Sequence, residues 1–200
     1  MKCQLAIVAA TLLSIAGLSH LAVAAYIPSK AILAQFLLRQ AWAKSQFIDA
    51  DVRPWPWADT HPVARLRLDR LGVDMIVLAG VNDRTMAFGP AYLETSATPV
   101  MAGHSILTGH RDTHFAFLAQ VAVGDRLVIK GRDKIERIYR VVRTHVADAR
   151  TDHIKLAESW DRVTLITCFP FNALKSGGPL RWVVTADAEP LMEKSHLGPD

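Results

Sequence analysis

The stretch RVTLITCF, residues 162–169, is a run of apolar and β-branched residues that is typical of a strand. Comparable short segments, separated by turn residues, lie at residues 63–71, 73–80, 125–130, 137–147 and 180–187. No regular helix intervenes between them, which argues against strand–helix–strand units. The sequence therefore predicts an all-β body, built as a closed or nearly closed β-barrel.

Length and composition agree with a single folded body. The chain has 200 residues, of which 50% are hydrophobic, so it can bury a sizeable core. The net charge of +4 is dispersed along the predicted strands. We see no basic patch for nucleic acid in this pattern and expect no nucleic-acid partner.

The two cysteines lie in different parts of the chain. Cys3 belongs to a hydrophobic leader, so the body holds one thiol, Cys168, and no internal disulfide. Free cysteine is among the most buried residue types, and the strand around Cys168 by itself predicts burial. In an oxidising compartment, however, an unpaired thiol has to be either buried or needed for chemistry.

Residues 1–27 form an apolar leader that, from Cys3 onwards, is broken only by Gln4, His20 and small polar residues. It is long enough to cross a bilayer of about 30 Å at about 1.5 Å per residue. We favour an uncleaved transmembrane anchor, and a signal peptide cleaved near AVAAY, residues 22–26, is the alternative. Lysine and arginine lie on both sides of the leader, so the charges do not fix its orientation.

Residues 28–60 are expected to link this leader to the body. Apolar and basic residues alternate at helical spacing over residues 29–47, where Ser29 is the predicted N-cap of an amphipathic helix. This helix is predicted to pack on the body, or alternatively to lie along the membrane surface. The proline-rich segment 51–62 ends the helix, and its tryptophans either reach the membrane interface or cover the domain edge.

Two residues near the predicted strands are suited to activate a cysteine. His110 follows the apolar stretch SILTG, residues 105–109, and Arg181 begins the apolar segment 181–184. If the segment carrying Arg181 pairs antiparallel with the strand of Cys168, the guanidinium lies beside the sulfur. There it can stabilise an oxyanion without losing its charge.

Four motifs together resemble the sortase family: TGHRDTHF at 108–115, GDRLVI at 124–129, TLITC at 164–168 and LRWVV at 180–184. The resemblance covers about residues 62–188 and follows the family order of histidine, cysteine and arginine. It implies a closed eight-stranded sortase-type β-barrel with short helices over residues 61–190, followed by a tail at 191–200. Segments 30–42, 54–59, 109–115 and 168–171 are most similar to the Gram-negative class of sortases.

The resemblance implies that Cys168 is the nucleophile, His110 the proton-transfer partner and Arg181 the stabiliser of substrate and oxyanion. The expected enzyme is a cysteine transpeptidase, a thiol peptidase of the hydrolase class. It would cleave an LPxTG-like signal at the C-terminus of a secreted protein and pass the acyl group to an amine that the sequence does not identify. The resemblance also implies a single-pass inner-membrane protein with its catalytic domain in the periplasm.

The neighbouring histidines are weaker candidates. His104 is expected in a loop after TPVMAG, whereas His110 is held at the end of a core strand and is favoured as the catalytic residue. His114 is four residues from His110, but HRDTH lacks the glutamate of a zinc hydrolase, so no metal site is expected. No cofactor is predicted, and calcium dependence stays open because Asp148, Asp152 and Glu158 lie in one plausible loop.

Asp112 and Thr167 are weak candidates for binding substrate or supporting the site. Asp112 either orients His110 or Arg181 or caps its own turn. Thr167 is expected to point to the face opposite Cys168 and to contribute a supporting hydrogen bond. Four apolar residues are expected either to line a groove or to pack in the core: Ile106, Leu118, Phe169 and Phe171.

Two other classes remain as alternatives. An L,D-transpeptidase needs a Ser-His-Gly-Cys element with an arginine two residues later, whereas here Phe169 and Pro170 follow the cysteine. A non-enzymatic periplasmic binding module would keep Cys168 as a packed core residue.

Overall fold

The computed structural model describes the whole chain apart from residues 1, 155, 157–160, 174–176 and 191–200. It divides into two compact units, residues 1–37 and 38–200, which are described separately. Helix α1, Lys2–Ile48, contributes to both.

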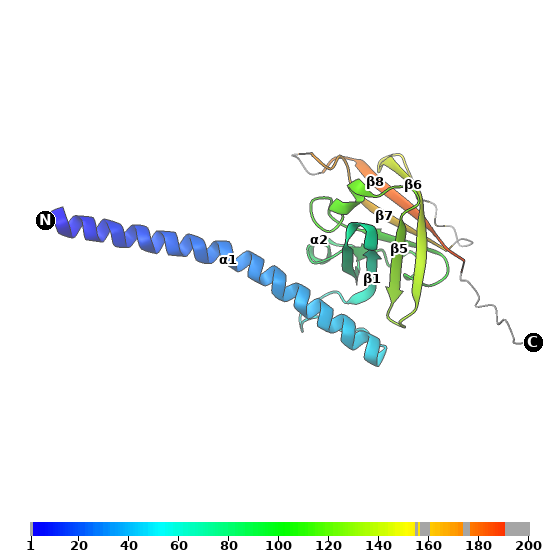
Figure 1. Ribbon diagram of the computed structural model, residues 1–200, viewed down its shortest axis with the longest axis horizontal. Coiled ribbons are helices and arrows are strands. Elements are labelled where there is room, and N and C mark those ends of the chain that lie inside the picture. Colours follow the sequence, from blue (N-terminus) through cyan, green and yellow to red (C-terminus); the bar gives the residue numbers. More distant parts are fainter. Residues whose placement is uncertain (1, 155, 157–160, 174–176, 191–200) are drawn as a thin grey trace, which may run out of the picture. The chain divides into compact units, whose positions relative to one another are not determined.

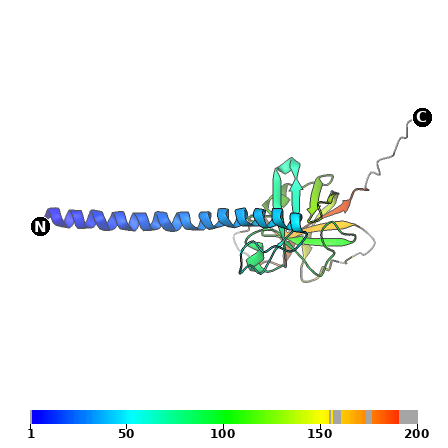
Figure 2. The same ribbon diagram turned by 90° about the horizontal axis from the view of Figure 1, so that it is seen from below.

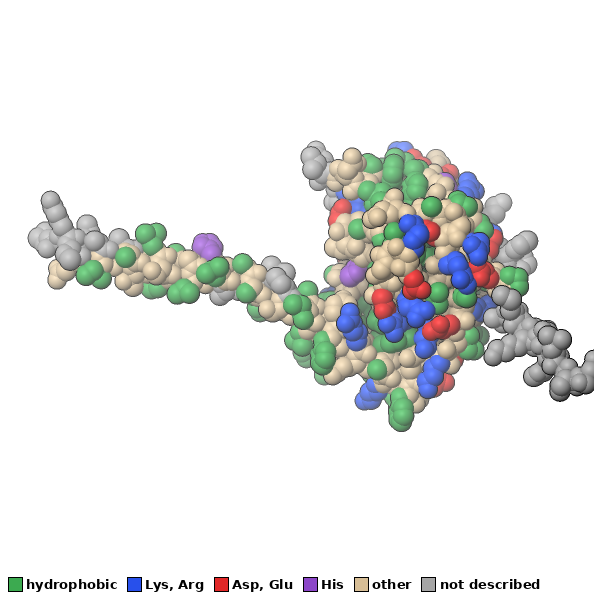
Figure 3. Space-filling view, in the orientation of Figure 1, with side chains coloured by type: hydrophobic (Ala, Val, Ile, Leu, Met, Phe, Trp, Pro, Cys, Tyr) green, Lys and Arg blue, Asp and Glu red, His purple; other side chains and the backbone are tan. Residues whose placement is uncertain are grey.

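Residues 10–48 of α1 are long and apolar enough to cross a membrane by length and composition. Large hydrophobic side chains are exposed along the N-terminal half of the helix (Figure 3). The predicted helix start at Ser29 is wrong. Ser29 lies inside α1, and its hydroxyl donates a hydrogen bond to the Ala25 carbonyl at 2.7 Å.

The last turns of α1 belong to the second unit and are partly buried there. Leu38 and Trp42 pack against Ile76 and Leu78 of strand β2, Val73–Ala79. Burial of these large apolar side chains joins the end of the helix to the barrel. The prediction that this segment packs on the body is confirmed for residues 38–48.

The two tryptophans after α1 have different environments. Trp55 packs edge-on against Phe88, with ring centroids 5.0 Å apart, and so covers the edge of the domain. Trp57 is 81% exposed. Covering the domain edge is thus confirmed for Trp55, whereas the membrane interface stays a prediction for Trp57.

Eight strands form one closed barrel, as predicted (Figures 1 and 2). Their order around the barrel is β1-β2-β3-β4-β7-β8-β6-β5, and β5 pairs with β1 to close it. The bounds not yet given are β1 Pro62–Leu68, β3 Ala91–Tyr92, β4 His104–Thr108, β5 Arg126–Gly131, β6 Glu136–Asp148, β7 Arg162–Cys168 and β8 Leu180–Ala188. The short helices are η1 Asp69–Leu71, α2 Asp83–Met86 and η2 Ala116–Gln120.

Two details of the barrel differ from the sequence prediction. Strand β3 was not predicted, because two residues are too short for a recognisable pattern. The prediction that His104 lies in a loop is wrong, since it is the first residue of β4. Its side chain is buried, and its Nε2 lies 2.8 Å from the Thr164 hydroxyl of β7.

Alternation along the strands separates the core from the outer surface. Leu66, Leu127, Leu165 and Val184 are fully buried in the central cluster. Successive side chains of a strand point to opposite faces, and Leu165 points inwards. Cys168 is three positions further along β7 and therefore points outwards. On the visible outer face, basic and acidic side chains are intermingled (Figure 3).

Candidate active site

Cys168 and Arg181 are directly opposite each other in adjacent antiparallel strands, β7 and β8. Side chains at directly paired positions share a face, with Cβ atoms about 4.5–5.5 Å apart. Both residues are partly buried. The predicted antiparallel pairing of the cysteine and arginine strands is confirmed.

The guanidinium of Arg181 is held by the backbone of its own loop. Its Nη1 donates hydrogen bonds to the Gly178 carbonyl at 2.6 Å and the Leu180 carbonyl at 2.9 Å. A permanently charged group is thereby kept at the start of β8, on the same face as the sulfur of Cys168.

His110 reaches the same end of the barrel from the other side of β7. Strand β4 runs parallel to β7, with Thr108 paired to Ile166, so residue 110 comes level with residue 168. The Gly109 amide donates to the Ile166 carbonyl at 3.3 Å. The Thr167 hydroxyl donates to the Gly109 carbonyl at 2.7 Å. Thr167 thus supplies the supporting hydrogen bond, from the face opposite Cys168.

His104 lies at the other end of the same strand. It is paired with Arg162, six positions before Cys168 on β7. At about 3.3 Å per residue, that separation is about 20 Å along the strand. The geometry therefore favours His110 over His104 as the partner of the cysteine.

Asp112 is paired with its neighbour Arg111. Its carboxylate accepts a hydrogen bond from Arg111 Nε at 3.3 Å, and its side chain is 69% exposed. Among the residues that the structure describes, it makes no hydrogen bond to His110 or Arg181.

His114 is a loop residue beside His110. Its Nε2 lies 3.4 Å from the Ala87 carbonyl. Burial lowers the pKa of His114 below its ordinary value, the hydrogen bond to Ala87 opposes that shift, and the charge of His110 adds to it. The described part of the chain contains no group of three or more histidine, cysteine or acidic residues that could hold a metal ion.

Arg111 was missed by the sequence analysis. It is only 7% exposed, and its Nη1 and Nη2 each donate a hydrogen bond at 2.9 Å, to the carbonyls of Pro170 and Ala173. An arginine next to a histidine in a polar loop is ordinarily expected in solvent, so the sequence offered no signal for this burial.

Three aromatic side chains surround the end of β7. Phe169 stacks on Trp182, with centroids 5.8 Å apart, and Phe171 packs edge-on against both rings. Trp182 Nε1 donates to the Leu118 carbonyl at 3.1 Å. Leu118 is a fully buried core residue, whereas Ile106 is paired with Thr164 on the face of Cys168.

The carboxylates considered for calcium are already engaged. Asp148 accepts hydrogen bonds from Arg150 Nε at 3.0 Å and Nη2 at 2.6 Å, which hold its pKa at about 2. The Asp152 carboxylate accepts from the Asp148 amide at 2.8 Å. Glu158 lies outside the described residues.

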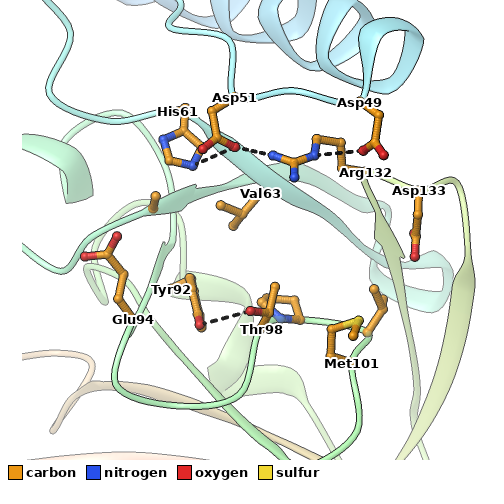
Figure 4. A pocket seen from close by; sticks show the side chains of 13 residues that line it. Asp49, Asp51, His61, Val63, Tyr92, Glu94, Thr98, Met101, Arg132 and Asp133 are labelled. Carbon is orange, nitrogen blue, oxygen red and sulfur yellow. Dashed lines mark hydrogen bonds and ion pairs between the residues drawn. The ribbon is translucent and has the colours of Figure 1, made fainter.

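A cavity of about 270 Å³ lies elsewhere on the second unit (Figure 4). His61 Nε2 is 3.3 Å from Asp51 there, and Arg132 bonds to Asp49 at 3.2 Å and also to Asp51. The cavity is lined by none of the predicted catalytic residues, so it is separate from the site at Cys168.

Comparison with known proteins gives one family. A family model described as a sortase domain matches residues 66–189, which is more than half of the chain. Sortase D from Bacillus subtilis (strain 168) is 26% identical over 120 residues, 60% of either protein. The match thus spans 60% of the length of that relative.

Solved structures have the same fold. Sortase C-1 from Actinomyces oris is 30% identical, with a TM-score of 0.57, over 65% of this chain and 74% of the other. Sortase A from Corynebacterium diphtheriae is 24% identical, with a TM-score of 0.60, over 69% and 65%. A sortase D5 transpeptidase from Clostridium perfringens is 17% identical, with a TM-score of 0.60, over 78% and 96%.

Thr167→Val tests the bond that holds Gly109. Valine keeps the shape of the side chain but leaves the buried Gly109 carbonyl without its donor, at a cost of about 1–3 kcal/mol. Thr167→Ser keeps the hydroxyl and is the matched control. Urea unfolding of both variants measures the difference, and equal stability of the two would show that the bond contributes nothing.

Arg150→Ala tests the pairing of Asp148. We expect the pKa of Asp148 to rise from about 2 towards its ordinary value of 3.8, because both guanidinium donors are lost. The depressed pKa means that the pair stabilises the fold above the unfolded-state pKa, and that this stabilisation is lost as the pH falls through about 2. Carboxyl carbon NMR titration measures the pKa, with Arg143→Ala as the control that leaves it unchanged.

Proposed function

The chain belongs to the sortase family, and from that membership we propose that it is a membrane-anchored cysteine transpeptidase with Cys168 as its nucleophile. The observation that carries the proposal is the pairing of Cys168 with Arg181 on β7 and β8. The hydrogen bonds of Gly109 to Ile166 and Thr167, which bring His110 to the same end of β7, further support the proposal.

The proposed first step is attack of the Cys168 sulfur on the threonyl carbonyl of an LPxTG-like sorting signal. The Thr–Gly amide bond breaks, a thioester forms, and the departing amine takes a proton from His110. Arg181 stabilises the negative charge that develops on the carbonyl oxygen.

In the second step an incoming amine gives its proton to His110 and displaces the sulfur from the acyl group. A new amide bond forms, the sulfur leaves as the thiolate and His110 again carries its proton, so the reaction needs no cofactor. With water in place of the amine, the same enzyme acts as a thiol peptidase of the hydrolase class. The substrate is a secreted protein with a C-terminal LPxTG-like sorting signal, and the acceptor amine is left unassigned.

We assign the chain to the Gram-negative sortases on the strength of segments 30–42, 54–59, 109–115 and 168–171. Residues 1–27 anchor it by a single pass in the inner membrane, and residues 28–60 connect the anchor to the barrel. Residues 61–190 form the catalytic domain in the periplasm, followed by the tail at 191–200. The apolar stretch of α1 supports the anchor.

Cys168→Ala tests the reaction. Incubation of the full-length protein in detergent with a library of sorting peptides and an amine is expected to give a thioacyl adduct in mass spectrometry. The adduct and the amide product disappear in Cys168→Ala, because no other thiol lies in the barrel. Cys3→Ala is the control and retains both. Undiminished product in Cys168→Ala would contradict the mechanism, and retained peptide binding without any adduct in the wild type would favour a binding module.

Labelling of the Cys168 thiol also tests on which side of the inner membrane the barrel lies. In cells whose outer membrane alone is permeabilised, a membrane-impermeant maleimide is expected to label Cys3→Ala, in which Cys168 is the remaining thiol. Labelling is read from the mass of the purified protein, and the Cys3→Ala/Cys168→Ala double variant is the blank. Labelling that appears only after lysis of the inner membrane would place the barrel in the cytoplasm.

A further inference from the structure

We propose that Arg111 is a positioning residue that sets the geometry between His110 and Cys168. Its buried guanidinium ties the segment that carries His110 to the segment that follows Cys168. The effect on the reaction rests on the proposed transpeptidase function, whereas the effect on thiol reactivity does not.

The contacts of Arg111 reach across the site. It directly follows His110, and its Nη1 and Nη2 donate to the carbonyls of Pro170 and Ala173, both at 2.9 Å. Those carbonyls belong to the loop that leaves β7 after Cys168 and leads towards Arg181. The Arg111 side chain therefore links the segment that carries His110 to the loop between Cys168 and Arg181.

The burial of Arg111 indicates a structural demand at this position. Arginine is seldom buried, because removing its charge from water is costly unless its donors are satisfied. Its planar guanidinium can place two donors on two carbonyls at once, which the single ammonium of lysine cannot reproduce with the same geometry. Loss of the side chain also leaves the two acceptors without their donors.

His110 is held from both sides by these contacts. On one side Gly109 is bonded to Ile166 and Thr167, and on the other side Arg111 is bonded to the loop after β7. The His110 side chain is exposed, and among the described residues it makes no hydrogen bond. The backbone on either side therefore has the main part in placing its imidazole near the sulfur.

Arg111→Met and Arg111→Lys, made in the full-length protein, test the proposal. Arg162→Met is the control, because Arg162 is a partly buried arginine whose guanidinium is bonded twice to Asp187 but lies at the opposite end of β7. Unfolding in urea identifies the loss of stability in each variant. All activity is measured under conditions in which circular dichroism shows the variants to be folded.

The first readout is the pH dependence of iodoacetamide alkylation of Cys168 in the Cys3→Ala background. A histidinium beside a thiol favours the reactive thiolate, so displacement of His110 is expected to move the alkylation profile of Arg111→Met to higher pH. The profile of Arg162→Met is expected to match that of the parent protein. The profile of Arg111→Lys is expected to lie between those of Arg162→Met and Arg111→Met. An unmoved profile in Arg111→Met would overturn the proposal, even with reduced stability.

The second readout is turnover with a sorting peptide. Because a displacement of about 1 Å costs about a hundredfold in rate, kcat of Arg111→Met is expected to fall by about tenfold to a hundredfold with little change in KM. Equal kcat in Arg111→Met and Arg162→Met would reduce Arg111 to a purely structural residue. If no substrate is turned over by the wild type, the proposed function fails, while the alkylation profile still decides the role of Arg111.

Discussion

The site depends on the position of β7 between one parallel and one antiparallel neighbour. The parallel pairing with β4 brings the C-terminal ends of β4 and β7 to the same edge, and the antiparallel pairing with β8 brings the beginning of β8 there too. His110, Cys168 and Arg181 come together for this reason, although 71 residues separate the first from the last. A sheet in which β4 and β7 ran antiparallel would place the histidine and the cysteine at opposite edges.

The hydrophobic core holds this arrangement in register. Val163 and Leu165 of β7 and Val184 of β8 are completely buried, and a slip of one residue would turn them to the outer face. The same slip would turn Cys168 inwards and lose its pairing with Arg181. Packing inside the barrel therefore fixes the face on which Cys168 lies. The inward hydroxyl of Thr167 in turn holds the Gly109 carbonyl.

Strand periodicity was enough to predict the barrel, because most of its strands are at least six residues long and carry a clear apolar pattern. It could not reveal β3, which has two residues. Nor could it reveal the start of β4 at His104, because this buried histidine depends on a hydroxyl from β7, a neighbouring strand that is 60 residues away in the sequence. The pairing of Cys168 with Arg181 was predictable from a strand, a loop and a returning strand. The burial of Arg111 was not, since its partners are carbonyl groups about 60 residues away, and backbone carbonyls leave no mark in the sequence.

These constraints explain why the fold persists at low sequence identity. The match to the sortase domain covers residues 66–189, yet the structural relatives described above are only 17–30% identical to this chain. Many combinations of apolar residues satisfy a barrel interior, provided that volume and alternation are kept. The three residues of the candidate site, His110, Cys168 and Arg181, need only strands whose order and direction are preserved. Contacts such as those of Arg111 depend on backbone carbonyls, so the residues that accept them are free to change while the geometry remains.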